Sequence, residues 1–386
     1  MKGDKMGSII RILQIGMTRN IGGLETYLMQ QFDYIDKNKL QYDFVNITAE
    51  YDIVFKDKIL SNGSKIYNIC SRHKNPIKHY YQWLELLRNT KNSYDAIVLN
   101  SNSLAYIFPL FAAMFCNIPV RILHSHNSNF EGNVNFLRDK LIKFNKKLMN
   151  ICVTHFLACS KKAGDWMFPE KDYLIVHNAI NTTPFIYNEY KRFNKRKELM
   201  LEDKFIVGHI GRFTYQKNHE AVINIFNSIL KRKNNAFLLL VGDAVDDMKF
   251  LDDAKKQVKS LGIENRVLFL GMRKDVPDLM QVMDIFLLPS KFEGLCLVGV
   301  EAQAAGLPCF FSDTITNEIN LTNLCHFMSL EQSADDWASE ILKCSCLVRK
   351  NMSKELNDVG YEIKNEIKKI ESFYLDVCKN KGNKYE

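Results

Sequence analysis

Short apolar runs alternate with helical stretches along this chain, and this alternation constrains its fold more than any other feature. One series of strand-like runs occupies the first half, at Ile10 to Ile15, Phe44 to Ile47, Lys65 to Tyr67, Ala96 to Asn100, Val120 to Leu123 and His155 to Ala158. A second series follows, at Phe205 to Ile210, Phe237 to Val241, Val267 to Leu270, Ile285 to Leu288 and Cys309 to Phe311. Strands that alternate with helices predict parallel sheets covered by helices.

The two series predict two domains. With 386 residues, 46% of them hydrophobic, the chain exceeds the usual size of a single domain and can bury a sizeable core. A polar, basic stretch from about Asn181 to Asp203 separates the series. We therefore predict an α/β protein with two doubly wound, Rossmann-like domains that face each other across a cleft.

A loop and helix late in the second series have the layout of a sugar-nucleotide pocket. Glu293 and Glu301 are separated by seven residues, and the helical periodicity from Leu295 to Ala305 stops at Gly306. The backbone of Gly294, Leu295, Cys296 and Leu297 thus falls at a helix N-terminus, where unpaired N–H groups suit a phosphate. Carboxylates on either side can accept hydrogen bonds from the hydroxyls of a hexose and a ribose.

Several motifs, taken in series, resemble the retaining glycosyltransferases of family 4, which have the two-domain GT-B fold. They are the E-x7-E segment just described, Gly211-Arg212-Phe-Thr-Tyr-Gln-Lys217-Asn218, Leu239-Leu-Val-Gly242-Asp243, Val176-His-Asn178-Ala-Ile-Asn181 with Ala179 in place of the usual glycine, His124-Ser-His126-Asn, Leu157-Ala-Cys-Ser160 and Gly22-Gly23. The resemblance is closest to bacterial capsular and exopolysaccharide enzymes. It implies an acceptor-binding domain over residues 7–182, a nucleotide-sugar-binding domain over 183–363, and a C-terminal helix, about 364–380, that crosses back onto the first domain.

Transfer of a sugar from a nucleotide diphosphate requires stabilisation of the departing diphosphate. The sequence has no Asp-x-Asp pair to hold a metal, so we expect cationic side chains to act instead, namely Arg212 and Lys217 beside Gly211. We expect no bound metal and no cofactor. A surface ion pair is the bland alternative for the two cations.

The resemblance assigns further roles. It implies that Glu301 binds the ribose, that Glu293 binds the donor hexose, and that His124, rather than His126, contacts the donor sugar. Gly22 and Gly23 would let backbone N–H groups approach a phosphate or the acceptor, and Arg273 follows the place where the family reads the nucleobase. The bland alternatives are a simple turn for the glycines, a core position for the histidines, a helix cap for Glu293 and a solvated helix face for Glu301.

Composition excludes other classes. Ten cysteines lack a C-x-x-C pair, which predicts neither a zinc site nor a disulfide framework. Cys296 has no neighbouring base in the sequence, so a nucleophilic role is disfavoured. The N-terminal segment has no signal-peptide core, and the longest apolar stretch, Leu104 to Cys116, is too short to span a bilayer, so we expect a cytoplasmic protein.

The formal charge of +8 is compatible with an anionic membrane, a phosphorylated substrate or nucleic acid. The segment from Phe136 to Met149 carries an apolar stripe and several lysines, and two interpretations stay open. It either lies on an anionic membrane that bears a lipid-linked acceptor, as a peripheral contact, or it is a basic surface helix packed on the core.

These observations predict a hexosyltransferase that moves a hexose from a nucleotide diphosphate sugar, UDP-linked, to a saccharide or lipid-linked saccharide in bacterial surface polysaccharide synthesis. One alternative is a sugar-nucleotide epimerase of the same fold. The other is a basic nucleic-acid-binding protein, although no nucleic-acid motif occurs and we expect no nucleic-acid partner.

Overall fold

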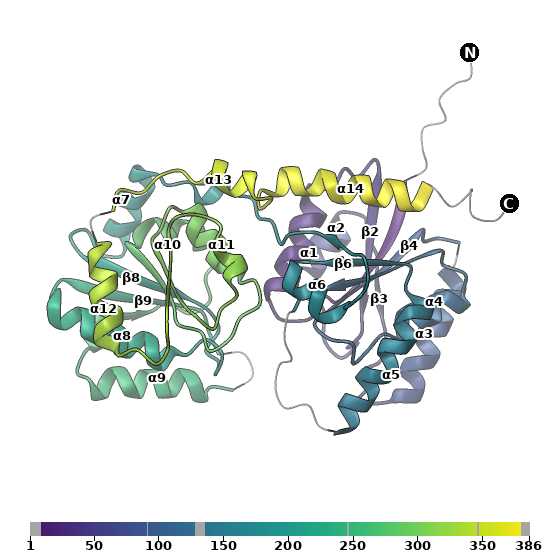
Figure 1. Cartoon of the computed structure of the whole chain (residues 1–386), viewed down its shortest axis with the longest axis horizontal. Coiled ribbons are helices and arrows are strands. Elements are labelled where there is room, and N and C mark those ends of the chain that lie inside the picture. Colours follow the sequence, from purple (N-terminus) through teal and green to yellow (C-terminus); the bar gives the residue numbers. More distant parts are fainter. Residues whose placement is uncertain (1–8, 91, 128–135, 245–246, 346, 380–386) are drawn as a thin grey trace, which may run out of the picture. The chain divides into compact units, whose positions relative to one another are not determined.

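The computed structural model describes residues 9–90, 92–127, 136–244, 247–345 and 347–379 (Figure 1). Its internal contacts divide the chain into two compact units. Unit 1 combines Met1–Ala179 with Ile363–Glu386, and unit 2 is Ile180–Glu362. Residues 7, 8 and 380, which fall within the bounds predicted above, lie outside the described residues.

Unit 1 is built on a seven-stranded sheet in the order β3-β2-β1-β4-β5-β6-β7. The strands are β1 (Ile10–Ile15), β2 (Leu40–Asn46), β3 (Ile66–Asn68), β4 (Ala96–Ser101), β5 (Val120–Ser125), β6 (His155–Ala158) and β7 (Leu174–Ile175). Every pairing between them is parallel. The predicted parallel, helix-covered sheet is therefore confirmed.

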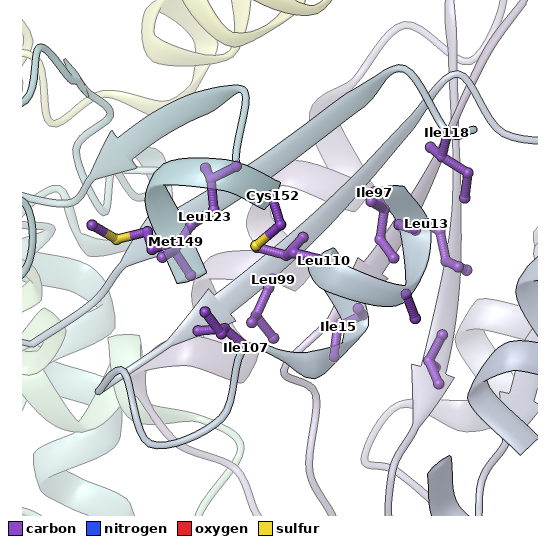
Figure 2. Close-up of a cluster of buried hydrophobic side chains, with 14 of the residues drawn as sticks. Leu13, Ile15, Ile97, Leu99, Ile107, Leu110, Ile118, Leu123, Met149 and Cys152 are labelled. Carbon is purple, nitrogen blue, oxygen red and sulfur yellow. The ribbon is translucent and has the colours of Figure 1, made fainter. Parts of the chain in front are cut away.

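Strand residues of unit 1 alternate between two buried faces. Leu13, Ile97 and Leu123 pack against one group of helices, as Figure 2 shows for part of this cluster. Ile12 and Val98 point to the other side. The first group is α3 (Pro76–Thr90), α4 (Phe108–Phe115), α5 (Phe136–Cys152) and α6 (Lys161–Met167), and the second is α1 (Gly23–Tyr34), α2 (Lys56–Ser61) and α14 (Ile363–Lys379).

The C-terminal helix α14 belongs to unit 1 although it follows unit 2 in sequence (Figure 1). The Glu371 carboxylate accepts a hydrogen bond from the backbone N–H of Asp36 at 2.6 Å, and the Glu366 carboxylate accepts one from the N–H of His177 at 2.9 Å. Tyr374 packs edge-on against Tyr42 with ring centroids 6.2 Å apart. These contacts fix the helix over β1 and α1.

Unit 2 contains a second parallel sheet, in the order β10-β9-β8-β11-β12-β13. Its strands are β8 (Phe205–Ile210), β9 (Ala236–Val241), β10 (Val267–Phe269), β11 (Ile285–Leu288), β12 (Cys309–Ser312) and β13 (Cys325–Met328). One face is covered by α8 (His219–Arg232), α9 (Lys249–Ser260) and α12 (Ala334–Lys343), and the other by α10 (Val276–Val282) and α11 (Leu297–Ala304). The unit also contains α7 (Glu189–Glu198), α13 (Ser353–Asp358) and short 3₁₀ turns at Thr183–Phe185, Glu264–Arg266 and Asn317–Ile319.

Three local expectations differ from the structure. The strands β7 and β13 were not predicted, because each is short and only partly buried. Helix α11 begins at Leu297 rather than Leu295, because Glu293 first forms a parallel bridge with Ile315 and the chain then bends at Gly294 and Leu295 before the helix starts. The polar stretch after Asn181 contains α7, which is charged on most sides and so lacks an apolar period.

Buried arginines hold the α7 side of unit 2 together. Arg349 donates to the carbonyl of Ala305 at 2.9 Å, at the end of α11, and to the carbonyl of Gln281 at 3.0 Å. Arg196 donates to the carbonyl of Val282 at 2.8 Å. Burial lowers the pKa of Arg349 to about 9. The guanidinium groups satisfy carbonyls that helix ends leave unpaired.

We therefore expect Arg349→Met to destabilise unit 2 by about 2–4 kcal/mol, since several buried carbonyls lose their donor. Hydrogen exchange measured by mass spectrometry on peptides from β11 and α11 should report the loss. Lys350→Met, at the exposed neighbouring position, is the control. Unchanged exchange in the Arg349 variant would show that water replaces the guanidinium without cost.

Candidate functional site

The topology of unit 2 places its candidate site between β8 and β11. These strands are neighbours in the sheet, yet the chain continues from β8 to β9 on one side and from β11 to β12 on the other. Loops that leave the carboxyl ends of such strands diverge and form the crevice where open α/β sheets bind ligands. The loop after β8 carries Arg212 and Lys217, and the loop after β11 carries Glu293.

The two loops are joined by an ion pair. Lys217 Nζ lies 2.7 Å from Glu293 Oε1, and the two side chains are only 14% and 8% exposed. Ser290 Oγ donates to the same carboxylate oxygen at 2.9 Å, and Gln216 Nε2 donates to Oε2 at 3.0 Å. Glu293 therefore keeps two neutral donors even when the ammonium group of Lys217 turns to another anion.

Glycines let these loops approach each other closely. Gly242 has φ +138°, and a Cβ there would lie 2.0 Å from the carbonyl oxygen of Gly211. A Cβ on Gly211 would in turn lie 3.0 Å from Cδ of Lys217. Position 242 thus excludes a larger residue, and Lys217 is held against the backbone that precedes Arg212.

Arg212 is exposed, and within the described parts of the chain its guanidinium has no hydrogen-bond or ion-pair partner. An arginine in this state can form a two-pronged contact with a phosphate without first breaking a contact within the protein. Arg212 therefore does not form the surface ion pair that was the alternative interpretation, whereas Lys217 is ion-paired with Glu293.

Glu301 lies on the second turn of α11, among the buried side chains of that helix. Its carboxylate has no hydrogen-bond donor in the described parts of the chain, and burial raises its pKa to about 7. The side chain is half-buried, so a partly desolvated carboxyl group without a donor there is suited to a ligand that offers hydroxyl groups.

The N-terminus of α11 is not capped by a side chain. Its N-cap residue is Cys296, which makes no capping hydrogen bond, so no side chain caps the N–H groups of Leu297 and Val298, while Gly299 N donates to the carbonyl of Cys296 at 2.9 Å. Cys296 is 6% exposed, and burial raises the pKa of its thiol to about 12, which removes any nucleophilic role. Its Sγ would lie 2.9 Å from a Cβ on Gly299, so cysteine at 296 packs against glycine at 299. Gly294 and Leu295 form a bend between the bridge at Glu293 and the helix.

Arg273 is occupied by other charges. It forms a bidentate pair with Asp275 at 2.8 Å and 2.7 Å, and Lys195 lies 2.8 Å from the same carboxylate. These cations hold the pKa of Asp275 well below its usual value. The side chain of Arg273 thus stabilises the loop after β10. Any contact of this loop with a nucleobase would be made by its backbone, as the family resemblance implies.

Sequence analysis missed the histidines beneath the Arg212 loop. His219 stacks on Phe213 with ring centroids 3.9 Å apart. His209 lies edge-on to the ring of His219, with centroids 4.7 Å apart. Burial lowers the pKa of His209 to about 4, so it stays neutral, and its Nδ1 pairs with the carbonyl of Leu287 at 2.9 Å. Gln216 and Ser290 were missed as well, because neither residue type signals a site without the Glu293 contact.

In unit 1 the predicted glycines lie at the start of α1. Gly22 is the N-cap residue, and a Cβ there would lie 2.8 Å from Oε2 of Glu25. The other oxygen of Glu25 accepts hydrogen bonds from Thr18 Oγ1 at 2.6 Å and from Thr18 N at 3.2 Å. Gly23 has open space where a Cβ would be. A Cβ at position 22 would thus crowd the carboxylate of Glu25, while Gly23 leaves room for an approaching group.

His124 and His126 lie together at the end of β5, with ring centroids 4.0 Å apart. His124 is 1% exposed, and its Nδ1 lies 3.3 Å from the hydroxyl of Tyr27. His126 is half-buried, and its Nε2 lies 3.1 Å from Oδ1 of Asn100. Burial holds the pKa of both rings far below the usual value, so both are neutral. Contact of His124 with a donor sugar stays a prediction, and His126 is the more accessible ring.

Comparison with known proteins first defines a class. A crystal structure of Anabaena Alr3699/HepE in complex with UDP matches the chain with a TM-score of 0.72 over 96% of this chain and 97% of its own, at 20% identity. The structure of WaaG, a glycosyltransferase involved in lipopolysaccharide biosynthesis, matches with a TM-score of 0.68 over 95% of this chain and 99% of its own, at 16% identity. The chain therefore has the GT-B fold.

The sequence is also similar to those of known glycosyltransferases. Residues 191–344 match the family model described as glycosyl transferases group 1. The putative glycosyltransferase EpsF of Bacillus subtilis is 28% identical over 94% of this chain and 96% of its own length. A UDP-Gal:alpha-D-GlcNAc-diphosphoundecaprenol alpha-1,3-galactosyltransferase of Escherichia coli is 24% identical over 97% and 99%. The chain thus matches the group 1 glycosyltransferases over residues 191–344 and is similar to known glycosyltransferases over nearly its whole length, and the predicted resemblance to exopolysaccharide enzymes is confirmed.

The described residues also bear on metal binding and membrane insertion. Within the described residues, no three His, Cys, Asp or Glu side chains come together in a way that could hold a metal ion. Among the described helices, none combines the length and the apolar character needed to cross a bilayer.

The contacts of Glu293 yield a test. We expect Gln216→Ala to leave UDP affinity within about twofold, but to weaken UDP-sugar affinity about tenfold, or about 1.4 kcal/mol, because the carboxylate loses one of its positioning donors. Isothermal titration of UDP and of UDP-glucose measures both. Gln257→Ala, which removes an amide that bridges α9 to α8, is the control. Equal losses for UDP and for UDP-glucose would contradict a role specific to the sugar.

Proposed function

We propose that this glycosyltransferase moves a hexose from a UDP-sugar to a saccharide or lipid-linked saccharide acceptor in bacterial surface polysaccharide synthesis, with retention of configuration. The observation that carries the proposal is the Lys217–Glu293 pair between the loops of β8 and β11, followed in sequence by the unpaired carboxyl group of Glu301 on α11. The galactosyltransferase of Escherichia coli, which by its name uses UDP-galactose and a diphosphoundecaprenol-linked sugar, supports this choice of substrates.

Donor binding would redistribute the charges of unit 2. The diphosphate would take the ammonium group of Lys217 and the guanidinium of Arg212, while the N-terminus of α11 adds its partial positive charge. Glu293, still held by Gln216 and Ser290, would then accept hydrogen bonds from the hexose. Glu301 would accept hydrogen bonds from the ribose hydroxyls.

The same cations would act in the chemical step. Negative charge grows on the diphosphate as the glycosidic bond breaks, and fixed positive groups in a dry site stabilise it more than water does. In the retaining mechanism that we propose, the acceptor hydroxyl attacks from the face of the leaving group, and the departing phosphate oxygen takes its proton. This step requires no side chain as base.

Binding of a nucleotide sugar in the presence of EDTA is the direct test. We expect titration calorimetry to detect at least one donor from a panel of UDP-sugars without added metal, and Glu301→Gln to weaken it about tenfold or more. Glu340→Gln, on α12, is the control. A donor that binds only after manganese is added would overturn the proposal, as would a change of the sugar in acceptor-free incubations, the mark of an epimerase.

The same titrations carry a signature of Glu301. Its raised pKa keeps the free carboxyl group largely protonated at pH 6.5, and hydroxyl donors favour the ionised form, so binding should release a proton. The measured heat should therefore vary with the ionisation enthalpy of the buffer. We expect the variation to disappear in the Glu301→Gln variant and as the pH rises above 8, where the carboxyl group is already ionised.

We also propose that α5 places the protein on the cytoplasmic face of an anionic membrane. One side of the helix is buried, where Asn145 donates to the carbonyl of Leu104 at 2.7 Å. Phe136, Phe144 and Ile151 on the helix are 71%, 62% and 65% exposed, and lysines flank them. The side chain of Leu137 lies outside the described residues. Exposed aromatic and apolar groups bordered by lysine suit the interface of an anionic bilayer.

Vesicle flotation tests this second proposal. Replacement of Lys140, Lys146 and Lys147 by glutamine should reduce binding to phosphatidylglycerol-containing vesicles at least tenfold, because each lysine near such a surface contributes about 1 kcal/mol. The matched control replaces Lys255, Lys256 and Lys259 on α9. Equal binding to neutral and anionic vesicles would contradict the proposal.

A further inference from the structure

The loops at the carboxyl edge of unit 1 contain an arginine that is prepared for an anion. Arg72, in the loop after β3, lies over the ring of Tyr106, in the loop after β4, with its guanidinium carbon 5.0 Å from the ring centroid. Buried His79 fixes this ring, since its Nε2 lies 2.6 Å from the hydroxyl of Tyr106 and its Nδ1 lies 2.6 Å from the carbonyl of Cys70. The position of Arg72 is therefore held by the fold.

The charge of Arg72 is not neutralised within the described parts of the chain. The side chain is half-buried, and it has neither a carboxylate partner nor a hydrogen bond there. A guanidinium that lies over a tyrosine ring keeps N–H groups free at its edges, and these can form two parallel bonds to an oxyanion. Little conformational entropy remains to be lost on binding.

Neighbouring loops add positive charge to the same rim. Arg19, in the loop after β1, lies over the ring of Tyr51, in the loop after β2, at 4.4 Å. Hydrogen bonds connect the loops, from Val54 N to Thr18 O at 2.8 Å and from Ala49 N to Ile69 O at 3.1 Å. The arginines and tyrosines thus belong to one continuous edge of the sheet, beside the switch point between β1 and β4.

The carboxylates of this rim are already paired. The loops that follow β1 to β4 contain only Glu50 and Asp52 as acidic residues. Glu50 lies 3.7 Å from Lys74, and Asp52 lies 2.9 Å from Lys56. Neither acid has Arg72 as its partner, so the rim keeps a net positive charge.

We propose that this rim, with Arg72 as its central residue, binds an oxyanion carried by the acceptor close to the sugar that is extended. The inference rests on the proposed function, because it assumes that unit 1 receives the acceptor. The shared chemistry is a planar or tetrahedral oxyanion that accepts two N–H bonds. It has two sources, the diphosphate of a lipid-linked sugar or the carboxylate of an acidic sugar.

Three probes with the same alkyl chain separate these sources. They are octyl N-acetylglucosaminide, which is neutral, octyl glucuronide, which carries a carboxylate, and N-acetylglucosaminyl octyl diphosphate. Each is titrated into the full chain saturated with UDP, so that the diphosphate probe cannot occupy the UDP site of unit 2. We expect one anionic probe to bind at least tenfold more tightly than the neutral probe, and the preferred probe identifies the source.

Variants at Arg72 decide the assignment. Arg72→Gln should abolish the preference for the anionic probe, and Arg72→Lys should reduce it at least threefold, since lysine keeps the charge but loses the fork and the stack. Arg88→Gln, at the exposed far end of α3, should leave it unchanged. If the glutamine variant fails to fold, judged by circular dichroism, the lysine variant decides.

The contrary outcomes are distinct. Absence of any preference, including no binding of all three probes, overturns the oxyanion site, as does a preference that survives in both Arg72 variants. UDP binding reports on the proposed function separately, because it depends on unit 2. A chain that binds UDP yet ignores the charge of the probe would therefore refute this inference alone.

Discussion

Parallel pairing of the strands is the constraint on which the rest of this structure depends. In a parallel sheet the chain crosses back over one face of the sheet after each strand. The loops that leave the carboxyl ends of the strands therefore all lie along one edge. In unit 2 this brings Lys217 within 2.7 Å of Glu293, although the two residues are far apart in sequence. In unit 1 it brings Arg72 over Tyr106. Both pairs therefore depend on loops from different strands that leave the same edge of a sheet.

Charge in unit 2 is arranged so that one carboxylate is satisfied and another is not. Glu293 has a cation and two neutral donors, whereas Glu301 has no donor in the described parts of the chain and an elevated pKa. Desolvation penalises both, but only the first is compensated within the protein. Glu301 is thus half-buried with a raised pKa and no donor among the described residues, so it can accept hydrogen bonds from a ligand with hydroxyl groups. This difference is what makes the site more than a surface ion pair.

The sequence predicted the fold well because long, strongly apolar strands such as β8 and β9 leave little freedom in their assignment. It placed Arg212, Lys217, Glu293 and Glu301 in the correct loops and helix, since motif spacing fixes their position relative to strand ends. It could not predict that Lys217 and Glu293 would pair, or that Gln216 and Ser290 would support them, because those contacts depend on loop paths set by glycines such as Gly242. The charged helix α7 was missed because its stabilising contacts are between arginine side chains and backbone carbonyls, which leave no apolar period.

The two units use different cations at their switch points, and the difference has a physical meaning. Lys217 is a compact charge that already has an acidic partner, so an incoming anion must compete with Glu293 for it. Arg72 has an aromatic partner, which stabilises its position without neutralising it. A site of the first kind couples binding of an anion to release of a carboxylate for a second contact. A site of the second kind offers recognition alone. This difference agrees with the proposed roles, in which unit 2 binds the donor that is cleaved and unit 1 holds the acceptor that is extended.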